Sequence, residues 1–232
     1  MVALYVLLGF ILLLIIDAFV IRAEKKYHPA FKKKYEIIEN VVFDNISVAV
    51  PADSFMSKGH TWAELLGNGL VKIGIDEFVL KSVGNFIVTK ISKPGTLLKK
   101  GDPFIEVKMG EKAISLRSPI DGTINYINDN LIGKNISDPY GEDWGAIISP
   151  VNFDKNAASL RANENVVEWM KSEFLKLKDY LKNNVVQHCL LPDSNAQLAG
   201  ATMFDGGKIV EGAVSQLNQE SIKKFEDEFL TV

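Results

Sequence analysis

The chain has little cysteine, little histidine and no excess of positive charge. One cysteine, Cys189, occurs in 232 residues, so no disulfide can form within the chain. The 26 lysines and arginines are outnumbered by 29 aspartates and glutamates. The resulting net charge of −3 provides no basic field, so we expect no nucleic-acid partner. The three histidines have no metal-ligand spacing, so we expect no metal site.

Sequence motifs for catalysis are also missing. The chain has no nucleophile motif, no phosphate-binding loop and no pattern of paired carboxylates. At 47% hydrophobic and 24% charged residues it has the composition of a folded protein. We therefore expect a carrier or structural subunit rather than an enzyme, with no catalytic residues.

A long apolar run opens the chain. Residues 2–21 contain a single charge, at Asp17. At about 1.5 Å per residue a helix of this length covers roughly 30 Å, the thickness of a bilayer core. Little polar or basic sequence precedes the run, which favours an uncleaved transmembrane anchor over residues 1–22 rather than a signal peptide. Asp17 could reach the lipid headgroups or contact a partner helix, and the sequence leaves both readings open.

Basic residues follow the apolar run and set its expected orientation. Arg22, Lys25 and Lys26 come directly after it, and 32–34 is a run of three lysines. By the positive-inside rule, the rest of the chain lies in the cytoplasm. We expect a single-pass protein of the inner (cell) membrane, with residues 23–49 connecting the anchor to the folded body.

Between residues 60 and 150 the pattern becomes that of a small β structure. Short apolar runs alternate with polar residues and are separated by glycine, proline and asparagine turns. The expected strands are residues 71–75, 86–91, 104–109, 113–118 and 123–127. Ile105, Val107 and Met109 should share one face of their strand, as should Ile114 and Leu116 of the next.

Two helices are expected beyond the β region. Apolar residues recur at helical spacing over residues 163–184, and again over about 219–230. Residues 185–232 form a C-terminal extension, with a final amphipathic helix and no motif of recognised chemistry.

Several motifs together resemble the glycine cleavage system H protein. His60-Thr61-Trp62 is similar to the family's His-x-Trp strand, and residues 118–122 (SPIDG) resemble its Ala-Pro-x-x-Gly turn. The run at residues 138–144 (DPYGEDW) is close to the family's Asp-Pro-Tyr-Gly-x-Gly-Trp. The likeness covers about residues 50–184. It implies a mainly β, barrel-sandwich hybrid (lipoyl-like) domain, to which this chain adds one N-terminal transmembrane helix and C-terminal α-helices.

In that family lipoate is attached to a lysine, followed by alanine, at the tip of a hairpin. Lys112-Ala113 reproduces this pair, but Lys112 precedes Pro119 by seven residues, and the family lysine lies one residue farther away. An ungapped alignment puts Glu111 at the arm position. Because a one-residue slip changes the face a side chain occupies, we expect no cofactor, while lipoate on Lys112 stays the alternative. Lys108-Met109 imitates a biotin carrier, but it lies within an expected strand.

Three functions follow from these observations. The favoured one is an accessory or scaffold subunit of a membrane complex, respiratory or redox in type, whose H-protein-like domain has lost lipoylation. Its partners would be the other subunits of that complex and, through residues 2–21, the lipid bilayer. The second is a working lipoyl carrier that uses Lys112 to move electrons or one-carbon or acyl units. The third is an export-pump adaptor, which the short turn at residues 110–112 and the inward-pointing basic flank disfavour.

Overall fold

The computed structural model describes residues 12, 15, 16, 35–39, 47–51, 53–162, 165–189 and 209–232, with the backbone alone at 35–39, 47, 165 and 185–189. The chain divides into two units, Met1–Tyr35 and Glu36–Val232. Within the described ranges no helix is both long and apolar enough to cross a bilayer. The expected anchor at residues 2–21, including Asp17, lies outside those ranges except for Leu12, Ile15 and Ile16.

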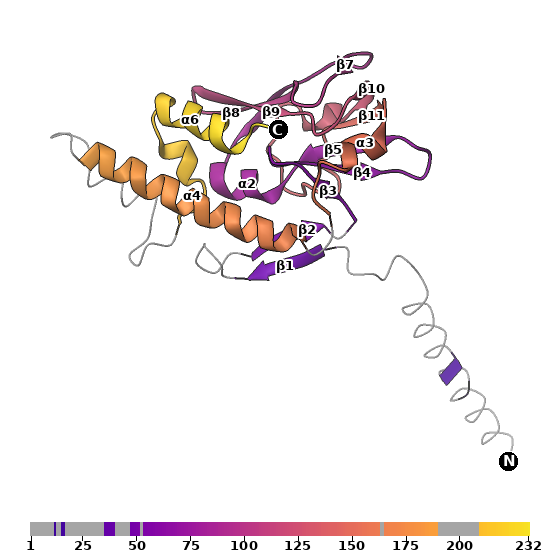
Figure 1. Ribbon diagram of the computed structural model, residues 1–232, viewed down its shortest axis with the longest axis horizontal. Helices are drawn as coiled ribbons and strands as arrows, with labels where there is room; N and C mark the ends of the chain where they lie inside the picture. The colour runs from indigo at the N-terminus through magenta and orange to yellow at the C-terminus, as the bar shows by residue number, and fades with distance from the viewer. Residues whose placement is uncertain are drawn as a thin grey trace, which may run out of the picture. The chain divides into compact units, whose positions relative to one another are not determined.

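Two antiparallel sheets form the body of the second unit (Figure 1). The six-stranded sheet has the order β3 (Phe55–Met56), β4 (Thr61–Leu65), β5 (Val71–Ile75), β11 (Ala146–Pro150), β10 (Gly122–Ile127) and β7 (Leu97–Leu98). The three-stranded sheet has the order β6 (Ile87–Ile91), β8 (Pro103–Met109) and β9 (Lys112–Arg117). A separate pair joins β1 (Tyr35–Glu39) to β2 (Ser47–Pro51). The expected mainly β architecture of two packed sheets is confirmed.

Alternation along the strands defines the core, as the sequence predicted. Ile105, Val107 and Met109 of β8 are buried, and the alternate positions Glu106 and Lys108 are more exposed. In β9, Ile114 and Leu116 are buried. All five expected strands are present, with their ends shifted by at most one residue. The strands predicted from the period-two pattern are therefore confirmed.

One short helix was not predicted from the sequence, and another extends beyond its predicted end. Helix α2 (Glu77–Val83) follows β5 directly; Asp76 caps it by accepting a hydrogen bond from the backbone N–H of Val79, and Gly84 ends it. Helix α4 (Asn165–Cys189) runs past the expected end at residue 184 because no glycine or proline interrupts it there. Two short helices, η2 (Asp129–Leu131) and α3 (Phe153–Ala157), lie in the connections.

Residues 209–232, the C-terminal segment, pack against the rest of the domain. We call that part, residues 53–184, the H-like body. The segment contains the 3-10 helix η3 (Ala213–Gln216) and helix α6 (Gln219–Phe229), which matches the expected final helix. Phe225 and Phe229 of α6 stack near Phe78 of α2, at ring-centroid distances of 6.5 and 5.7 Å. In Figure 1, α6 (yellow) lies beside β8, β9 and α2, and α4 (orange) passes α2 on its other side.

A small polar cluster joins α4 to α6 inside this aromatic packing. The hydroxyl of Tyr180 donates a hydrogen bond to the carbonyl of Ser221, and the hydroxyl of Ser221 lies 2.6 Å from Oδ1 of Asn184. Burial raises the pKa of Tyr180 to about 12, so the phenol stays protonated and remains a donor. Each buried polar group in the cluster therefore has a partner, which offsets the cost of desolvating it.

Candidate functional site: the lysine end of the hairpin

The hairpin that resembles the lipoate-bearing one turns through two residues, Gly110 and Glu111. Met109 at the end of β8 pairs directly with Lys112 at the start of β9. Gly110 has φ of 61°, and among the described non-glycine residues only His60 has a positive φ, so φ of Glu111 is negative. Glycine first and a negative φ second define a type II′ turn, a common two-residue connection in hairpins. The turn leaves no room for the inserted coiled hairpin of an export-pump adaptor.

This register places Lys112 in a strand and Glu111 at the tip. Alternate residues of a strand lie on the same face. Lys112 therefore lies on the same face of β9 as Ile114 and Leu116, which are both buried. Its cross-strand partner Met109 is buried too. Lys112 therefore starts the inner face of β9. Glu111, which occupies the arm position in the ungapped alignment, is exposed at the tip.

The ammonium group of Lys112 is bound by the C-terminal segment. Nζ of Lys112 donates hydrogen bonds to the carbonyl of Ser215 at 2.9 Å and to that of Leu217 at 2.6 Å. Both carbonyls lie at the carboxyl end of η3, where helical carbonyls lack partners within the helix and carry partial negative charge. A cationic donor suits that position, and the lysine side chain is half-buried there.

A second contact fixes α6 along the same strand. β9 is an edge strand of the three-stranded sheet, so half of its backbone N–H groups lack a partner in the sheet. Oε1 of Glu226 in α6 accepts a hydrogen bond from the backbone N–H of Ser115 at 3.1 Å. The C-terminal segment thus covers both the lysine and the free edge of its strand.

Lipoate does not fit this arrangement of Lys112. An arm-bearing lysine needs an amine that stands clear of the domain, whereas this amine has two carbonyl partners and starts on the inner face. Lys108, the position of the biotin-like pair, is exposed but lies inside β8, opposite Ala113. Glu111 has the exposed position without an amine.

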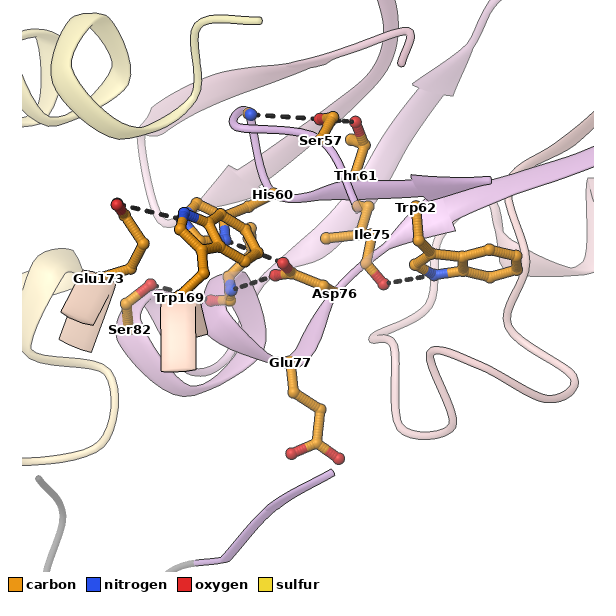
Figure 2. A network of polar contacts seen from close by, with 12 residues as sticks. Ser57, His60, Thr61, Trp62, Ile75, Asp76, Glu77, Ser82, Trp169 and Glu173 are labelled. Carbon is orange, nitrogen blue, oxygen red and sulfur yellow. Dashed lines mark hydrogen bonds and ion pairs between the residues drawn. The ribbon is translucent and has the colours of Figure 1, made fainter. Parts of the chain in front are cut away.

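A polar cluster between α2 and α4 is built around His60, the first residue of the His-x-Trp motif (Figure 2). His60 is fully buried, with Nδ1 2.8 Å from Oδ2 of Asp76 and Nε2 3.7 Å from Oε2 of Glu173 in α4. The second separation is that of an ion pair rather than a hydrogen bond. The imidazole lies between the rings of Phe78, 3.7 Å away, and Trp169, 5.0 Å away.

The two carboxylates determine the charge of this imidazole. Burial lowers the pKa of His60, but the carboxylates of Asp76 and Glu173 outweigh it, so the pKa is raised from its ordinary value. Burial raises the pKa of Glu173, but His60 outweighs that effect and the pKa is lowered. Both shifts favour a charged pair, which ties α4 to the start of β4. This is a structural role.

A polar surface hollow adjoins the lysine contacts. It has a volume of about 550 Å³ and lies where the end of α2, the loop at residues 135–137 and the C-terminal segment meet. Ser215, whose carbonyl binds Lys112, is part of its wall. Across the described ranges no group of three or more histidine, cysteine or carboxylate side chains could hold a metal ion.

The two sheets, the hairpin and the His-x-Trp strand together define a lipoyl-type domain. The sequence model of the family described as "Glycine cleavage H-protein" matches residues 55–173. The chain belongs to the glycine cleavage H-protein family, a family of lipoyl carriers that are not themselves catalysts.

The sequences of two relatives agree with this assignment. The "Probable glycine cleavage system H protein" of Pyrococcus abyssi is 30% identical over 121 residues, which are 51% of this chain and 90% of that protein. The "Glycine cleavage system H protein 2" of Aquifex aeolicus is 28% identical over 141 residues, 59% of this chain and 83% of that protein. The crystal structure of a glycine cleavage system H protein from Mycobacterium marinum aligns at a TM-score of 0.40 and 21% identity, covering 47% of this chain and 97% of that chain.

The acceptors of the lysine could not be predicted from the sequence. Ser215 and Leu217 act through backbone carbonyls, which carry no residue-specific signal, and they follow Lys112 by about a hundred residues. The available signal was the amphipathic pattern of residues 219–230, which required an apolar partner surface somewhere on the molecule.

Proposed function

We propose that this chain is a non-catalytic accessory or scaffold subunit of a membrane complex, in which an H-protein domain serves as a docking module without lipoate. The observation that carries the proposal is the placement of the Lys112 ammonium against the carbonyls of Ser215 and Leu217. Because this amine is only half-buried, we expect its two hydrogen bonds to contribute about 1–3 kcal/mol together, which is the cost of exposing it.

Membrane attachment rests on the sequence. The apolar run at residues 2–21 and the basic residues after it support an anchor with the H-protein domain on the cytoplasmic side. That the complex is respiratory or redox in type stays a prediction. A reporter enzyme active only in the cytoplasm, fused after Val232, should be active in whole cells; activity only of a periplasmic reporter would contradict the orientation.

The second candidate function is a working lipoyl carrier. Family membership and the Lys112-Ala113 pair favour it. For this function the C-terminal segment would have to leave Lys112. The carrier hypothesis requires that Lys112→Arg abolish both a lipoyl adduct and activity.

Intact mass separates the two functions. The full chain, extracted in mild detergent from cells that lipoylate their own H protein, should have the mass of the unmodified polypeptide. The host's H protein from the same cells is the positive control. A lipoyl adduct that is absent from the Lys112→Arg variant would overturn the accessory function and establish the carrier.

A further inference from the structure

The C-terminal segment has an apolar side that is almost wholly used against the H-like body. Its buried apolar residues are Ile209, Ala213, Val214, Leu217, Ile222, Phe225, Phe229 and Leu230. Its exposed positions are polar or charged, including Gln216, Lys223 and Asp227. The segment is therefore built for this surface rather than resting on it loosely.

Contacts at three places fix the segment in one register. The backbone N–H of Gly212 donates to the carbonyl of Lys81 at 2.9 Å at the end of α2. The ammonium of Lys112 binds the end of η3, and Glu226 binds the edge of β9 at Ser115. Two of the three places are on the strand that begins with the hairpin lysine.

We propose that residues 209–232 are an intramolecular cover of the lysine end of the hairpin, with the Lys112 ammonium as its latch. The segment occupies the face of the hairpin at which another protein would reach the amine. Lys112 reacts with acylating reagents only when the cover is displaced. The proposal deepens the proposed function and rests on it in taking Lys112 as unmodified.

Amine labelling of the full chain tests the cover. A limiting amount of the N-hydroxysuccinimide ester of acetic acid is added, and acetylation of each lysine is followed by peptide mass spectrometry. Lys108, exposed on the same hairpin, is the internal reference. We expect Lys112 to react at least about tenfold more slowly than Lys108.

Displacing the cover should raise that rate. Val214→Asp puts a charge at a fully buried position of η3, whereas Gln219→Asp puts the same charge at an exposed position at the start of α6. The first variant should bring Lys112 to within about threefold of Lys108, and the second should change nothing. Lys72, bound to Glu64 at 2.8 Å in the β4–β5 hairpin, should keep its rate in both variants and reports that the body remains folded.

Hydrogen exchange tests whether the Lys112 ammonium holds the cover in place, even if Val214→Asp unfolds the chain. Lys112→Met keeps most of the side chain and removes the ammonium. Amides of residues 213–217 should exchange at least about tenfold faster in this variant, while those of β4 and β5 stay unchanged.

Equal labelling of Lys112 and Lys108 in the unmodified wild-type chain would overturn the cover, and unchanged exchange in Lys112→Met would overturn the latch. A natural lipoyl adduct, in contrast, would overturn the proposed function.

Discussion

A shift of one residue along β9 moves a side chain from one face of the sheet to the other. In the ungapped alignment with the family Glu111 takes the arm position, and in the structure it is exposed at the tip while Lys112 starts the inner face of β9. Gly110 and Glu111 close the turn in two residues, so Lys112 pairs with Met109 as the first residue of its strand. We propose that register, rather than loss of the lysine, decides the chemistry of the hairpin.

Removing the Lys112 ammonium should destabilise the chain. In Lys112→Met the carbonyls of Ser215 and Leu217 lose a charged donor, and we expect the free energy of unfolding to fall by about 1–3 kcal/mol. Urea unfolding followed by tryptophan fluorescence measures it. Lys108→Met, at an exposed position on the same hairpin, is the control and should stay within about 0.5 kcal/mol of wild type. Equal stability of the two variants would show that the lysine contacts contribute nothing.

The buried pair of His60 and Glu173 should make stability depend on pH. Because the pKa of His60 is raised above 6.5 in the folded state, its stabilising contribution is complete below that pH and is lost as pH rises through the raised value. Because the pKa of Glu173 is lowered below 4.5, its contribution is present above that pH and is lost as pH falls. The free energy of unfolding should therefore be higher for wild type than for Glu173→Gln, and this difference should be largest between about pH 4.5 and 6.5. Urea unfolding at pH 5.5 and pH 9 measures the difference, and a gap that widens towards pH 9 would contradict this sign.

At the scale of elements, the close crossing of α2 and the C-terminal segment depends on glycine. A Cβ added at Gly84 would lie 2.6 Å from Cα of Gly212, and Gly84 also has φ of 75°. Gly95 has a similar φ of 83° but open space around its added Cβ. The two positions share a positive φ, but Gly84 also has ψ of −133° and a close neighbour, so an added Cβ is penalised there both by the backbone and by the steric overlap.

Gly84→Ala should cost more stability than Gly95→Ala. The difference includes the overlap with Gly212, and overpacking of this kind typically costs about 1–3 kcal/mol. The midpoints of urea unfolding of the two variants and wild type measure it. If both variants lose the same amount, the C-terminal segment does not lie tightly against α2.

The elements were predictable where a long or strict pattern defined them. The five strands and the final helix follow from alternation and helical spacing over several residues each. Helix α2 was missed because it has only seven residues, although Asp76 before Glu77 is a start signal for a helix. The end of α4 was placed too early because Asn183 and Asn184 resemble a terminus, whereas Asn184 is buried and bonded inside the helix packing.

At the scale of the whole molecule, the surface against which the C-terminal segment packs could not be predicted. Its apolar stripe required a partner surface, but nothing in the sequence identifies the inner face at Lys112 and the aromatic rings of α2 and α4 as that surface. The candidate residues Lys112 and Glu111 were found from the family pattern, and the backbone carbonyls that bind the lysine were not. Contacts between distant segments through main-chain atoms leave no mark in a single sequence.

Moving the lysine by one position tests the central claim most directly. The double variant Glu111→Lys/Lys112→Ala restores the lysine-alanine order at the exposed tip and removes the latch. Wild type and the variant are expressed in the same cells with a lipoate ligase and lipoate, and their intact masses are measured. We expect a lipoyl adduct on the variant and none on wild type; an adduct on wild type at Lys112, or none on the variant, would contradict the claim that this lysine is withheld by its register and by the contacts that the register gives it.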